Sequence, residues 1–324
     1  MPIDNDTVDE QLGSIYIIVL NWNQWALTAD CIQSLLQVES PHLHTFQIVV
    51  VDNASRDGSI EKLEGLFPNQ ITLLRNAANL GFSGGNNVGI KYALKQSADY
   101  IMLLNNDTKV GADFLKPLLE RLCKQTNIGV STPKIYFMHR SRVIWAVGGE
   151  IIRWSGKGRA RGQNEVDVGQ HDQAQPVDFA AGCCFLAKRA VFEQVGMLDE
   201  AYFAYFEDVD WSQRVWKCGW EVWYEPESDV WHVAGASISS TDPKSQGHRT
   251  PFLIYLLARN NLWFIQSHLS GLWRLTALLA FFARDVFYYS AAYLLLFRFQ
   301  KLKSLWRGVY DGTRKHSISM NQTT

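Results

Sequence analysis

The segment AYFAYFEDVDWSQR, residues 201–214, places carboxylates among aromatic side chains within one short stretch. Burial among aromatic rings can raise the pKa of a carboxylate and ready it as a general base, and Asp208, next to Glu207, is the candidate. Asp210 has a second interpretation. A carboxylate in a first helical turn stabilises the helix N-terminus, and Asp210 and Arg214 have the i, i+4 spacing of an exposed ion pair. We therefore predict catalysis for Asp208 and a surface pair for Asp210.

Polar residues directly follow three predicted strands, in the segments NWN (21–23), DNAS (52–55) and NND (105–107). Ligands of open α/β sheets bind beyond the carboxyl ends of the strands, so these loops are expected to line a site. Asp52 can accept a hydrogen bond from a ribose hydroxyl or a base N–H, and it equally suits the opening of a turn. Asp107 can give a divalent cation an oxygen ligand while a diphosphate and water supply the rest. Its alternative role is to cap a turn.

A glycine-rich segment, NLGFSGGNN at residues 79–87, precedes a helical pattern. Backbone N–H groups in such a loop can approach an anion at a helix N-terminus, where the dipole favours phosphate. The segment lacks both GxGxxG and the GK[ST] of a P-loop. It predicts either a phosphate-facing loop or a tight strand-to-helix turn.

The elements that must position these residues alternate between strand and helix. Short apolar runs predict strands at residues 15–20, 48–51, 71–74 and 100–104, and their continuous apolar character suits a sheet buried on both faces. Helical spacing predicts helices at residues 25–36, 60–67, 86–94 and 114–123. This alternation indicates a doubly wound α/β half.

Composition excludes several other classes of protein. With 324 residues, 47% of them hydrophobic, the chain is long enough for one large domain plus an appendage. Lys+Arg (31) nearly balances Asp+Glu (32), so no overall field favours nucleic acid. The five cysteines lack CxxC spacing, which argues against a disulfide framework or a zinc knuckle and favours a reducing cytosol. The acidic, polar N-terminus is not expected to act as a signal or transit peptide.

Taken together, the motifs resemble the family-2 glycosyltransferases of the GT-A fold, and most closely the bacterial rhamnosyltransferase-like branch. The matching pieces occur in order: VLNWN, VVVDNASRDGS, NLGFSGGNNVGI, MLLNNDT, GCCFLAKRAVFEQVGMLDEAYFAYFEDVDWSQRVWKCGW and VWHVAGAS. They cover about residues 14–238. The set is specific although no single piece is. The resemblance implies an α/β GT-A fold, with a Rossmann-like nucleotide-binding half and a mixed central sheet, followed here by aromatic-rich C-terminal helices.

The resemblance also implies roles for individual residues. The base would be Asp208 with Glu207 in support, and the metal ligands, for Mg²⁺ or Mn²⁺, would be Asp107 and His232. The family's metal motif is usually written DXD, and Asn105 holds its first position here, which leaves one carboxylate for the ion. Residues expected at the nucleotide sugar are Asn21 and Asp52 at the nucleoside, Asn79, Gly81, Phe82 and Asn86 against the donor, Asn106 in the diphosphate motif, and Gly182 on the floor of the sugar pocket.

The C-terminal segment has a different character. Residues 275–283 and 286–297 are uncharged apolar runs separated by Arg284 and Asp285, so a simple membrane-spanning helix is disfavoured. Aromatic residues followed by basic ones suit helices that lie in a membrane interface, and a cap or dimer surface packed on the catalytic domain is the alternative. Arg259 lies on a probable helix and is expected to face the active site or a lipid phosphate.

We therefore predict an inverting, metal-dependent glycosyltransferase. The resemblance implies a lipid-linked or cell-surface glycan as acceptor and favours dTDP-L-rhamnose as donor, with glucosyl, galactofuranosyl and N-acetylhexosaminyl donors left open. Its expected location is cytoplasmic, peripheral on the inner face of the cell membrane, with no nucleic-acid partner and a homodimer left open. The expected parts are a polar tail (1–13), the GT-A domain (14–245), a helical region (246–312) and a second tail (313–324). A nucleotidyltransferase and a non-catalytic sugar-nucleotide-binding or scaffold protein are the alternatives.

Overall fold

The structure, a computed structural model, describes residues 13–39, 45–233 and 250–314. Within them the strands are β1 (Ser14–Asn21), β2 (Thr45–Asp52), β3 (Thr72–Arg75), β4 (Tyr100–Asn105), β5 (Thr108–Val110), β6 (Ile128–Phe137), β7 (Arg140–Ala146), β8 (Gly149–Ile152), β9 (Lys157–Ala160), β10 (Gln175–Pro176), β11 (Cys184–Lys188) and β12 (Glu221–His232). The α-helices are α1 (Trp25–Leu35), α2 (Ser59–Leu66), α3 (Gly81–Lys95), α4 (Leu115–Lys124), α5 (Arg189–Val195), α6 (Glu207–Lys217), α7 (Pro251–His268), α8 (Gly271–Ala280), α9 (Tyr289–Leu295) and α10 (Phe299–Thr313).

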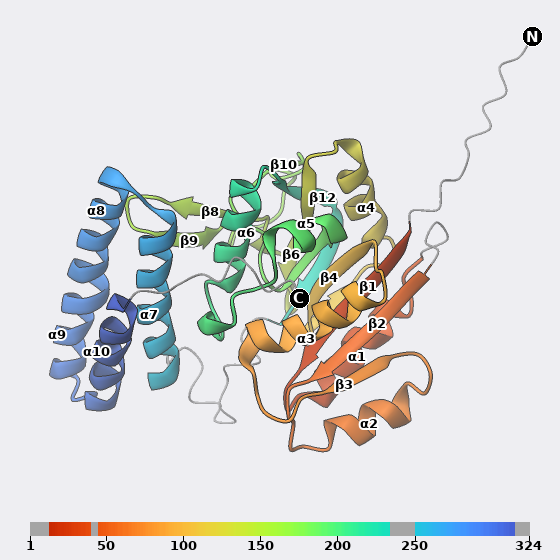
Figure 1. Cartoon of the computed structure of the whole chain (residues 1–324), viewed down its shortest axis with the longest axis horizontal. Helices are drawn as coiled ribbons and strands as arrows, with labels where there is room; N and C mark the ends of the chain where they lie inside the picture. Colours follow the sequence, from red (N-terminus) through yellow and green to blue (C-terminus); the bar gives the residue numbers. More distant parts are fainter. Residues whose placement is uncertain (1–12, 40–44, 234–249, 315–324) are drawn as a thin grey trace, which may run out of the picture.

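A mixed sheet forms the centre of the molecule (Figure 1). In the described part of the chain it has the order β10-β12-β6-β11-β4-β1-β2-β3, with β5 paired to β12 and β7 to β6. Strands β4, β1, β2 and β3 are parallel, and β11 enters antiparallel between β4 and β6. The four predicted strands are confirmed as β1 to β4, with small differences at their ends.

Helices cover both faces of this sheet. Apolar residues of α1, α2 and α4 share one buried cluster with one face, and those of α3, α5 and α6 share another with the opposite face. The continuous apolar sequence of β1, SIYIIVLN, follows from this arrangement, since side chains pointing to either face are buried. The sheet therefore fixes the carboxyl ends of β1, β2 and β4 side by side.

Helices α7 to α10 form a separate group at one side of the sheet (Figure 1). The N-cap of α7 is Thr250, whose hydroxyl accepts a hydrogen bond from the Leu253 N–H, and Pro251 follows in the first turn. Helix α10 lies against α7, and the two contribute to a third apolar cluster that also includes Ala277 of α8. The predicted boundary at residues 245 and 246 lies outside the described residues.

Helix α8, a π-helical segment (Phe281–Tyr288) and α9 follow one another without a break. In the described part of the chain, this Gly271–Leu295 stretch is the one helix long and apolar enough to cross a membrane by length and composition. Of the two charges that interrupt its apolar sequence, Arg284 is exposed, whereas Asp285 is largely buried. The Asp285 carboxylate lies 2.7 Å from the Lys157 ammonium on β9, so the charge is directed against the β8–β9 hairpin.

Candidate active site

A buried hydrogen-bond network joins the carboxyl ends of β1, β2 and β4. The Asn106 amide donates to the Thr28 hydroxyl (3.0 Å), which donates to Asn21 Oδ1 (2.7 Å). The Asn21 amide donates to Asp52 Oδ1 (2.8 Å), and the Ser55 N–H donates to Asp52 Oδ2 (2.9 Å). The structure thus brings together three predicted site residues from three strands.

Burial changes the expected role of two of these residues. Asn21 and Asp52 are both 0% exposed, and each already has partners within the network. Their contact with a nucleoside therefore stays a prediction, and what the structure shows is that they fix the loops above them. Ser55 belongs to the predicted DNAS loop, whereas Thr28 was missed from the sequence. The signal that could have found Thr28 is its place one turn into α1, directly after the β1 loop.

The glycine-rich segment differs from the prediction. Helix α3 begins at Gly81, so residues 81–86 form its first turns rather than a loop that precedes it. The Gly81 N–H donates to Asn79 Oδ1 (2.8 Å), and the N–H groups of Phe82 and Ser83 both donate to Phe203 O (2.6 and 3.2 Å). Because these donors are taken, the structure favours the tight strand-to-helix turn over the phosphate-facing loop, the two alternatives that the sequence left open. Phe203, which accepts two of the three hydrogen bonds, lies far away in sequence.

Side-chain amides hold this junction together. The Asn53 amide nitrogen donates to Asn79 Oδ1 and to Gly81 O, both at 3.0 Å, and the Asn86 amide donates to Phe82 O (2.9 Å). Gly81 has a φ of +73°, and a Cβ there would lie 2.5 Å from Phe203 O. The glycine is therefore required by both the backbone conformation and the close contact.

Asp107 and His232 lie together, as the resemblance implied. Strand β5 pairs with β12 so that Thr108 is opposite His232, and the His232 Nε2 atom is 3.1 Å from Asp107 Oδ1. Both side chains are almost completely buried, and Trp145 packs edge-on against the imidazole with ring centroids 4.7 Å apart. Among the described residues, no hydrogen bond satisfies Asp107 Oδ1.

This pair fits part of a divalent-cation site. The described residues contain no group of three or more His, Cys, Asp or Glu side chains that could enclose an ion. Mg²⁺ commonly takes one or two carboxylates from the protein and completes its shell with substrate phosphates and water. The under-bonded carboxylate oxygen of Asp107 next to the imidazole nitrogen of His232 is compatible with this open arrangement.

Three carboxylates lie in the first turn of α6, and their surroundings differ. Glu207 and Asp210 are buried, whereas Asp208 is partly exposed. Burial raises the pKa of Glu207 well above its usual value, the Asp208 charge adds to this, and Glu207 Oε2 has no hydrogen-bond partner in the described part of the chain. Burial also raises the pKa of Asp208, against the opposing effect of backbone N–H donors. Asp208 is therefore the one of the three that a substrate can reach.

The loop before β11 lies next to Asp208, and its residue Cys183 is affected by the charges of both Asp208 and Asp107. The Gly182 N–H donates to Asp208 Oδ2 (2.9 Å), and a Cβ on Gly182 would lie 3.2 Å from Asp208. Burial raises the pKa of the neighbouring Cys183 thiol well above its usual value, and the charges of Asp107 and Asp208 both contribute. The charges of both carboxylates thus affect the same buried thiol. Gly182 lies against the base, which is consistent with its expected place near the sugar.

The predicted ion pair of Asp210 and Arg214 forms, but the expectation that it lies at the surface is wrong. Asp210 is 0% exposed, and its carboxylate accepts hydrogen bonds from the Arg214 guanidinium (2.9 Å) and from His268 Nε2 (2.6 Å). Burial alone would raise the pKa of Asp210, but its partners His268 and Arg214 outweigh this and lower it. The physical reason is tertiary: α7 packs on α6 and brings His268 over this face.

Of the two positions expected for Arg259, at the active site or at a lipid phosphate, the structure favours the first. Its guanidinium donates to the carbonyl oxygens of Ala201 (2.8 Å) and Tyr202 (3.0 Å) and lies over the Trp263 ring at 4.3 Å. It therefore holds the chain just before Asp208 rather than facing a lipid phosphate.

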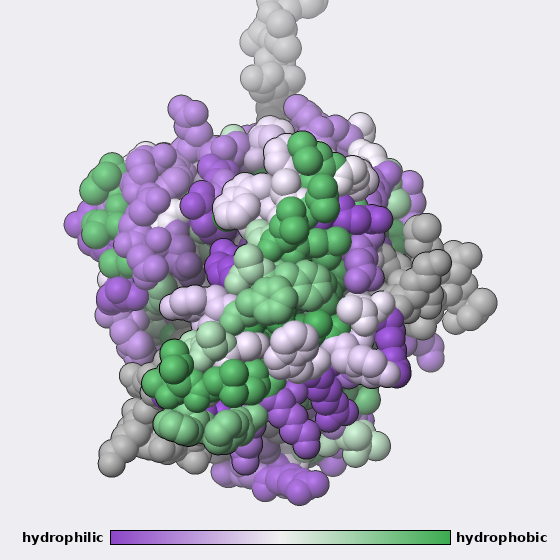
Figure 2. All heavy atoms as spheres, turned by 90° about the vertical axis from the view of Figure 1, so that its left-hand side faces the viewer, coloured by the Kyte–Doolittle hydropathy of each residue, from purple (hydrophilic) through white to green (hydrophobic). Residues whose placement is uncertain are grey.

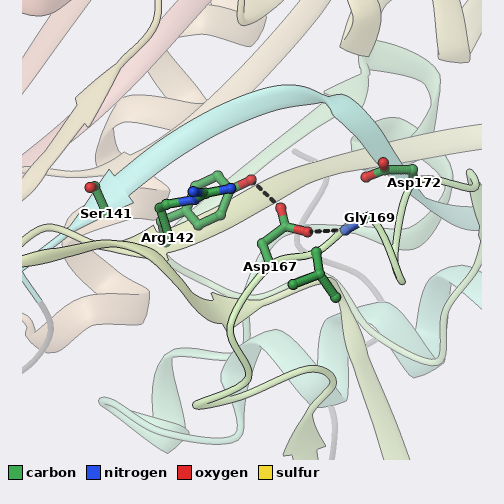
Figure 3. Close-up of a pocket in the computed structure, with 7 residues that line it drawn as sticks. Ser141, Arg142, Asp167, Gly169 and Asp172 are labelled. Carbon is green, nitrogen blue, oxygen red and sulfur yellow. Dashed lines mark hydrogen bonds between the residues drawn. The ribbon is translucent and has the colours of Figure 1, made fainter.

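A separate hollow of about 430 Å³ is lined by Tyr136, Ser141, Arg142, Asp167, Val168, Gly169 and Asp172 (Figure 3). None of the predicted site residues lines it. Burial alone would raise the pKa of Asp167, but hydrogen bonds from Tyr136, the Gly169 N–H and Lys134 lower it to about 2. Tyr136 and the Gly169 N–H both donate hydrogen bonds to the Asp167 carboxylate, the latter visible in Figure 3, so these polar groups satisfy one another.

Comparison with known families decides the class of this site. Residues 16–196, more than half of the chain, match the family described as Glycosyl transferase family 2. The chain belongs to this family. The resemblance seen in the sequence is thereby confirmed.

The chain is similar to three glycosyltransferases from different organisms. The chain is 30% identical over 169 residues to the low-salt glycan biosynthesis hexosyltransferase Agl10 of Haloferax volcanii, covering 52% of each chain. It is 27% identical to the N-acetylglucosaminyl-diphospho-decaprenol L-rhamnosyltransferase of Mycobacterium tuberculosis, over 69% of this chain and 82% of the relative. It is 23% identical to the dTDP-rhamnosyl transferase RfbF of Shigella flexneri, over 77% and 82%. The chain thus spans about half the length of Agl10 and most of the other two.

Solved structures confirm the fold. The TM-score is 0.60 to GalNAc-T7 with UDP, GalNAc and Mn²⁺, at 17% identity over 78% of this chain and 47% of that one. It is 0.59 to S. aureus TarS in complex with UDP-GlcNAc, at 14% identity over 92% and 81%. The mixed central sheet with helices on both faces is the GT-A fold of these glycosyltransferases.

Proposed function

We propose that this protein is an inverting glycosyltransferase. It moves a sugar, L-rhamnose first among the candidates, from a nucleotide-diphosphate donor to a hydroxyl of a lipid-linked or cell-surface glycan. The observation that carries the proposal is that Asp208 is partly exposed, whereas its neighbours Glu207 and Asp210 are buried. Asp208 also lies next to Gly182, and its charge affects the same Cys183 thiol as the charge of Asp107. The names of the M. tuberculosis and S. flexneri relatives support rhamnose, and the latter supports dTDP.

The chemistry is one displacement at the anomeric carbon. Asp208 accepts the proton of the acceptor hydroxyl, whose oxygen forms a bond to the anomeric carbon while the bond from that carbon to the diphosphate breaks. Attack from the opposite side inverts the configuration. A raised pKa makes the Asp208 carboxylate a stronger proton acceptor than an ordinary aspartate.

The Asp107 side of the site would receive the leaving diphosphate. Asp107 and His232 would hold Mg²⁺ or Mn²⁺, and a bound ion supplies positive charge that stabilises the diphosphate. Asn106 lies next to them at the end of the buried network. Asn21, Asp52, Asn79, Phe82 and Asn86 are proposed to shape the nucleoside side, since they fix the β1 and β2 loops and the start of α3.

A donor screen tests the class, the donor and the base together. Purified protein is given nucleotide sugars and a glycan acceptor, and nucleoside diphosphate release and the anomeric configuration of the product are measured. Asp208→Asn keeps the shape of the side chain but cannot accept the proton, so transfer should fall about 10²–10⁴-fold. Release of pyrophosphate would indicate a nucleotidyltransferase instead. A product with retained configuration would refute the inverting mechanism.

Two substitutions in the NND motif test the cation site. After Asp107→Asn the motif contains only amide oxygens, and these bind hard divalent ions less well than a carboxylate does. Mn²⁺-dependent donor binding should therefore weaken strongly. Asn105→Asp restores a second carboxylate and should strengthen it. Mn²⁺ titration followed by electron paramagnetic resonance measures both changes. Unchanged affinity in both variants would move the ligand role away from this loop.

The C-terminal helices present an exposed apolar surface. Figure 2 shows a band of hydrophobic residues across this face of the molecule. The exposed large apolar side chains of α8, α9 and the segments beside them are Leu272, Trp273, Leu275, Leu279, Phe287, Tyr288, Leu294, Leu295, Leu296, Phe297 and Phe299. Arg298 and Lys303 follow along the chain, a combination that favours an anionic membrane surface. A peripheral location on the inner face of the cell membrane is therefore part of the proposal.

Vesicle flotation tests this surface. The double variant Leu279→Glu, Leu295→Glu places charges on the apolar face and should abolish binding to phosphatidylglycerol vesicles. Leu66→Glu is the matched control, because Leu66 is 50% exposed but lies on α2. If the wild-type protein stays free of anionic vesicles and sediments as a dimer that the double variant disrupts, the surface is a dimer interface.

A further inference from the structure

The loop that leads into the base has an unusual backbone. Phe203, Tyr205 and Phe206 have φ angles of +64°, +69° and +75°, a region that residues with a Cβ rarely adopt. Three such residues lie within four positions, and α6 begins directly after them at Glu207. Conformations of this kind persist only where the surroundings hold them.

The side chain of Asn260 contacts this loop at three carbonyl groups. The Asn260 amide nitrogen, on α7, lies within hydrogen-bond distance of three carbonyl oxygens, those of Tyr202 (3.1 Å), Ala204 (2.9 Å) and Tyr205 (2.7 Å). Asn260 is 0% exposed, and its own oxygen accepts a hydrogen bond from Arg259 Nε (2.9 Å). The amide therefore binds the inner side of the loop and has no exposed surface for a substrate.

The loop connects both halves of the proposed site. Phe203 O accepts hydrogen bonds from the first turn of α3, and Phe206 O accepts one from the Asp210 N–H in α6 (2.8 Å). Asp208 follows these two carbonyls along the chain and lies within the turn that the hydrogen bond between Phe206 O and Asp210 N–H closes. A change in the loop would therefore move the carboxylate relative to the donor side of the site.

We propose that Asn260 is a positioning residue for the base, an inference that rests on the proposed function. Its amide gathers three loop carbonyls and so holds residues 202–206 in the strained conformation that aims Asp208 at the acceptor hydroxyl. Misplacement of a reacting group by about 1 Å can cost about 10²-fold in rate. The effect of losing Asn260 should thus appear in kcat rather than in folding alone.

The next residue provides the control. Asn261 is also buried on α7, but its amide donates to Gly156 O (2.8 Å) in the β8–β9 turn, away from the base. Asn260→Ala and Asn261→Ala remove the same chemical group from neighbouring positions. Hydrogen exchange followed by mass spectrometry, thermal unfolding, and kcat and KM are measured for both variants.

Asn260→Ala should speed hydrogen exchange of the backbone amides in residues 201–208. It should also lower kcat at least tenfold, with a smaller change in donor KM. The acidic limb of the pH–rate profile, which reports the protonation of Asp208, should shift. Asn261→Ala should leave these three readouts near wild type. If Asn260→Ala does not fold, Asn260→Ser, which keeps one donor, replaces it. Equal losses in both variants, or a normal kcat in Asn260→Ala, would overturn the proposal. A wild-type protein that transfers no sugar would refute the proposed function, whereas the exchange measurement would still test the hold on the loop.

Discussion

Asp210→Asn should destabilise the protein strongly, although the substitution changes only one atom. Asp210 is fully buried between Arg214 and His268, and breaking a buried ion pair typically costs about 3–5 kcal/mol, because the remaining charge stays buried. The asparagine keeps one oxygen for either His268 or Arg214, and Arg214 keeps its bonds to the carbonyls of Val195 and Met197. We therefore expect the lower end, about 3 kcal/mol.

Thermal unfolding at pH 7 measures this cost. At about 2 °C for each kcal/mol in a chain of this size, the midpoint should fall by about 6 °C. The loss should persist in high salt, because buried pairs are screened much less than exposed ones. Asp208→Asn is the control: burial raises the pKa of Asp208, so removing its charge should not lower the midpoint.

The pH dependence gives an independent check. The pKa of Asp210 is lowered in the folded protein, so its charge contributes stability that is present above about pH 4, the usual pKa of an unfolded aspartate, and is lost as the pH falls through the folded value. The difference between wild type and Asp210→Asn should therefore close below about pH 4. An unchanged midpoint at pH 7, or a difference that salt removes, would refute the buried pair.

Substitutions at Glu207 and Gly81 test two further features, and Gly65→Ala is the control for the second. The pKa of Glu207 is raised in the folded protein, so the wild type loses stability as the pH rises from the usual pKa of glutamate toward the pKa of Glu207 in the folded state. Glu207→Gln lacks this titration. Its melting temperature relative to wild type should therefore rise with pH. A melting difference that does not depend on pH would contradict the shift. Gly81→Ala combines a positive φ with a Cβ 2.5 Å from Phe203 O and should cost about 1–3 kcal/mol in urea unfolding. Gly65→Ala, which meets nothing within 4 Å, should stabilise by about 0.4–1 kcal/mol, and equal effects at both glycines would refute the steric argument.

The sequence predicted the parts of the fold that depend on local pattern. Strands β1, β2 and β4 were found because sheet burial on both faces requires continuous apolar runs, and β3, which is only partly buried, still has the apolar pair Leu73 and Leu74. The placement of Asp107 and Asp52 at strand ends followed from the same runs. The pairing of Asp107 with His232 was implied by the family resemblance alone, since the two residues meet only through the pairing of β5 with β12.

What the sequence could not predict are contacts between distant segments. The sequence could not decide between a phosphate-facing loop and a tight turn in the glycine-rich segment, because it does not reveal that Phe203 O, about 120 residues further along the chain, accepts hydrogen bonds from two of its N–H groups. Asp210 was expected at the surface because its i, i+4 partner is visible in sequence, whereas His268 is not. Both cases have the same cause: local spacing describes a helix alone, and tertiary packing decides which of its faces is buried.

Helix α7 is thereby more than an attachment to the catalytic domain. It contacts the segment around the base at both ends: Arg259 and Asn260 hold the carbonyls before α6, and His268 binds Asp210 within it. Lys217, at the end of α6, donates to Ser267 O (3.2 Å) and lies 3.0 Å from His268 Nδ1. Removing the chain from α8 onward would also strip α10 from α7 and expose their shared apolar cluster. Lost activity after such a truncation would therefore not separate membrane attachment from support of the base, whereas charges placed on the exposed face of α8 and α9 do so.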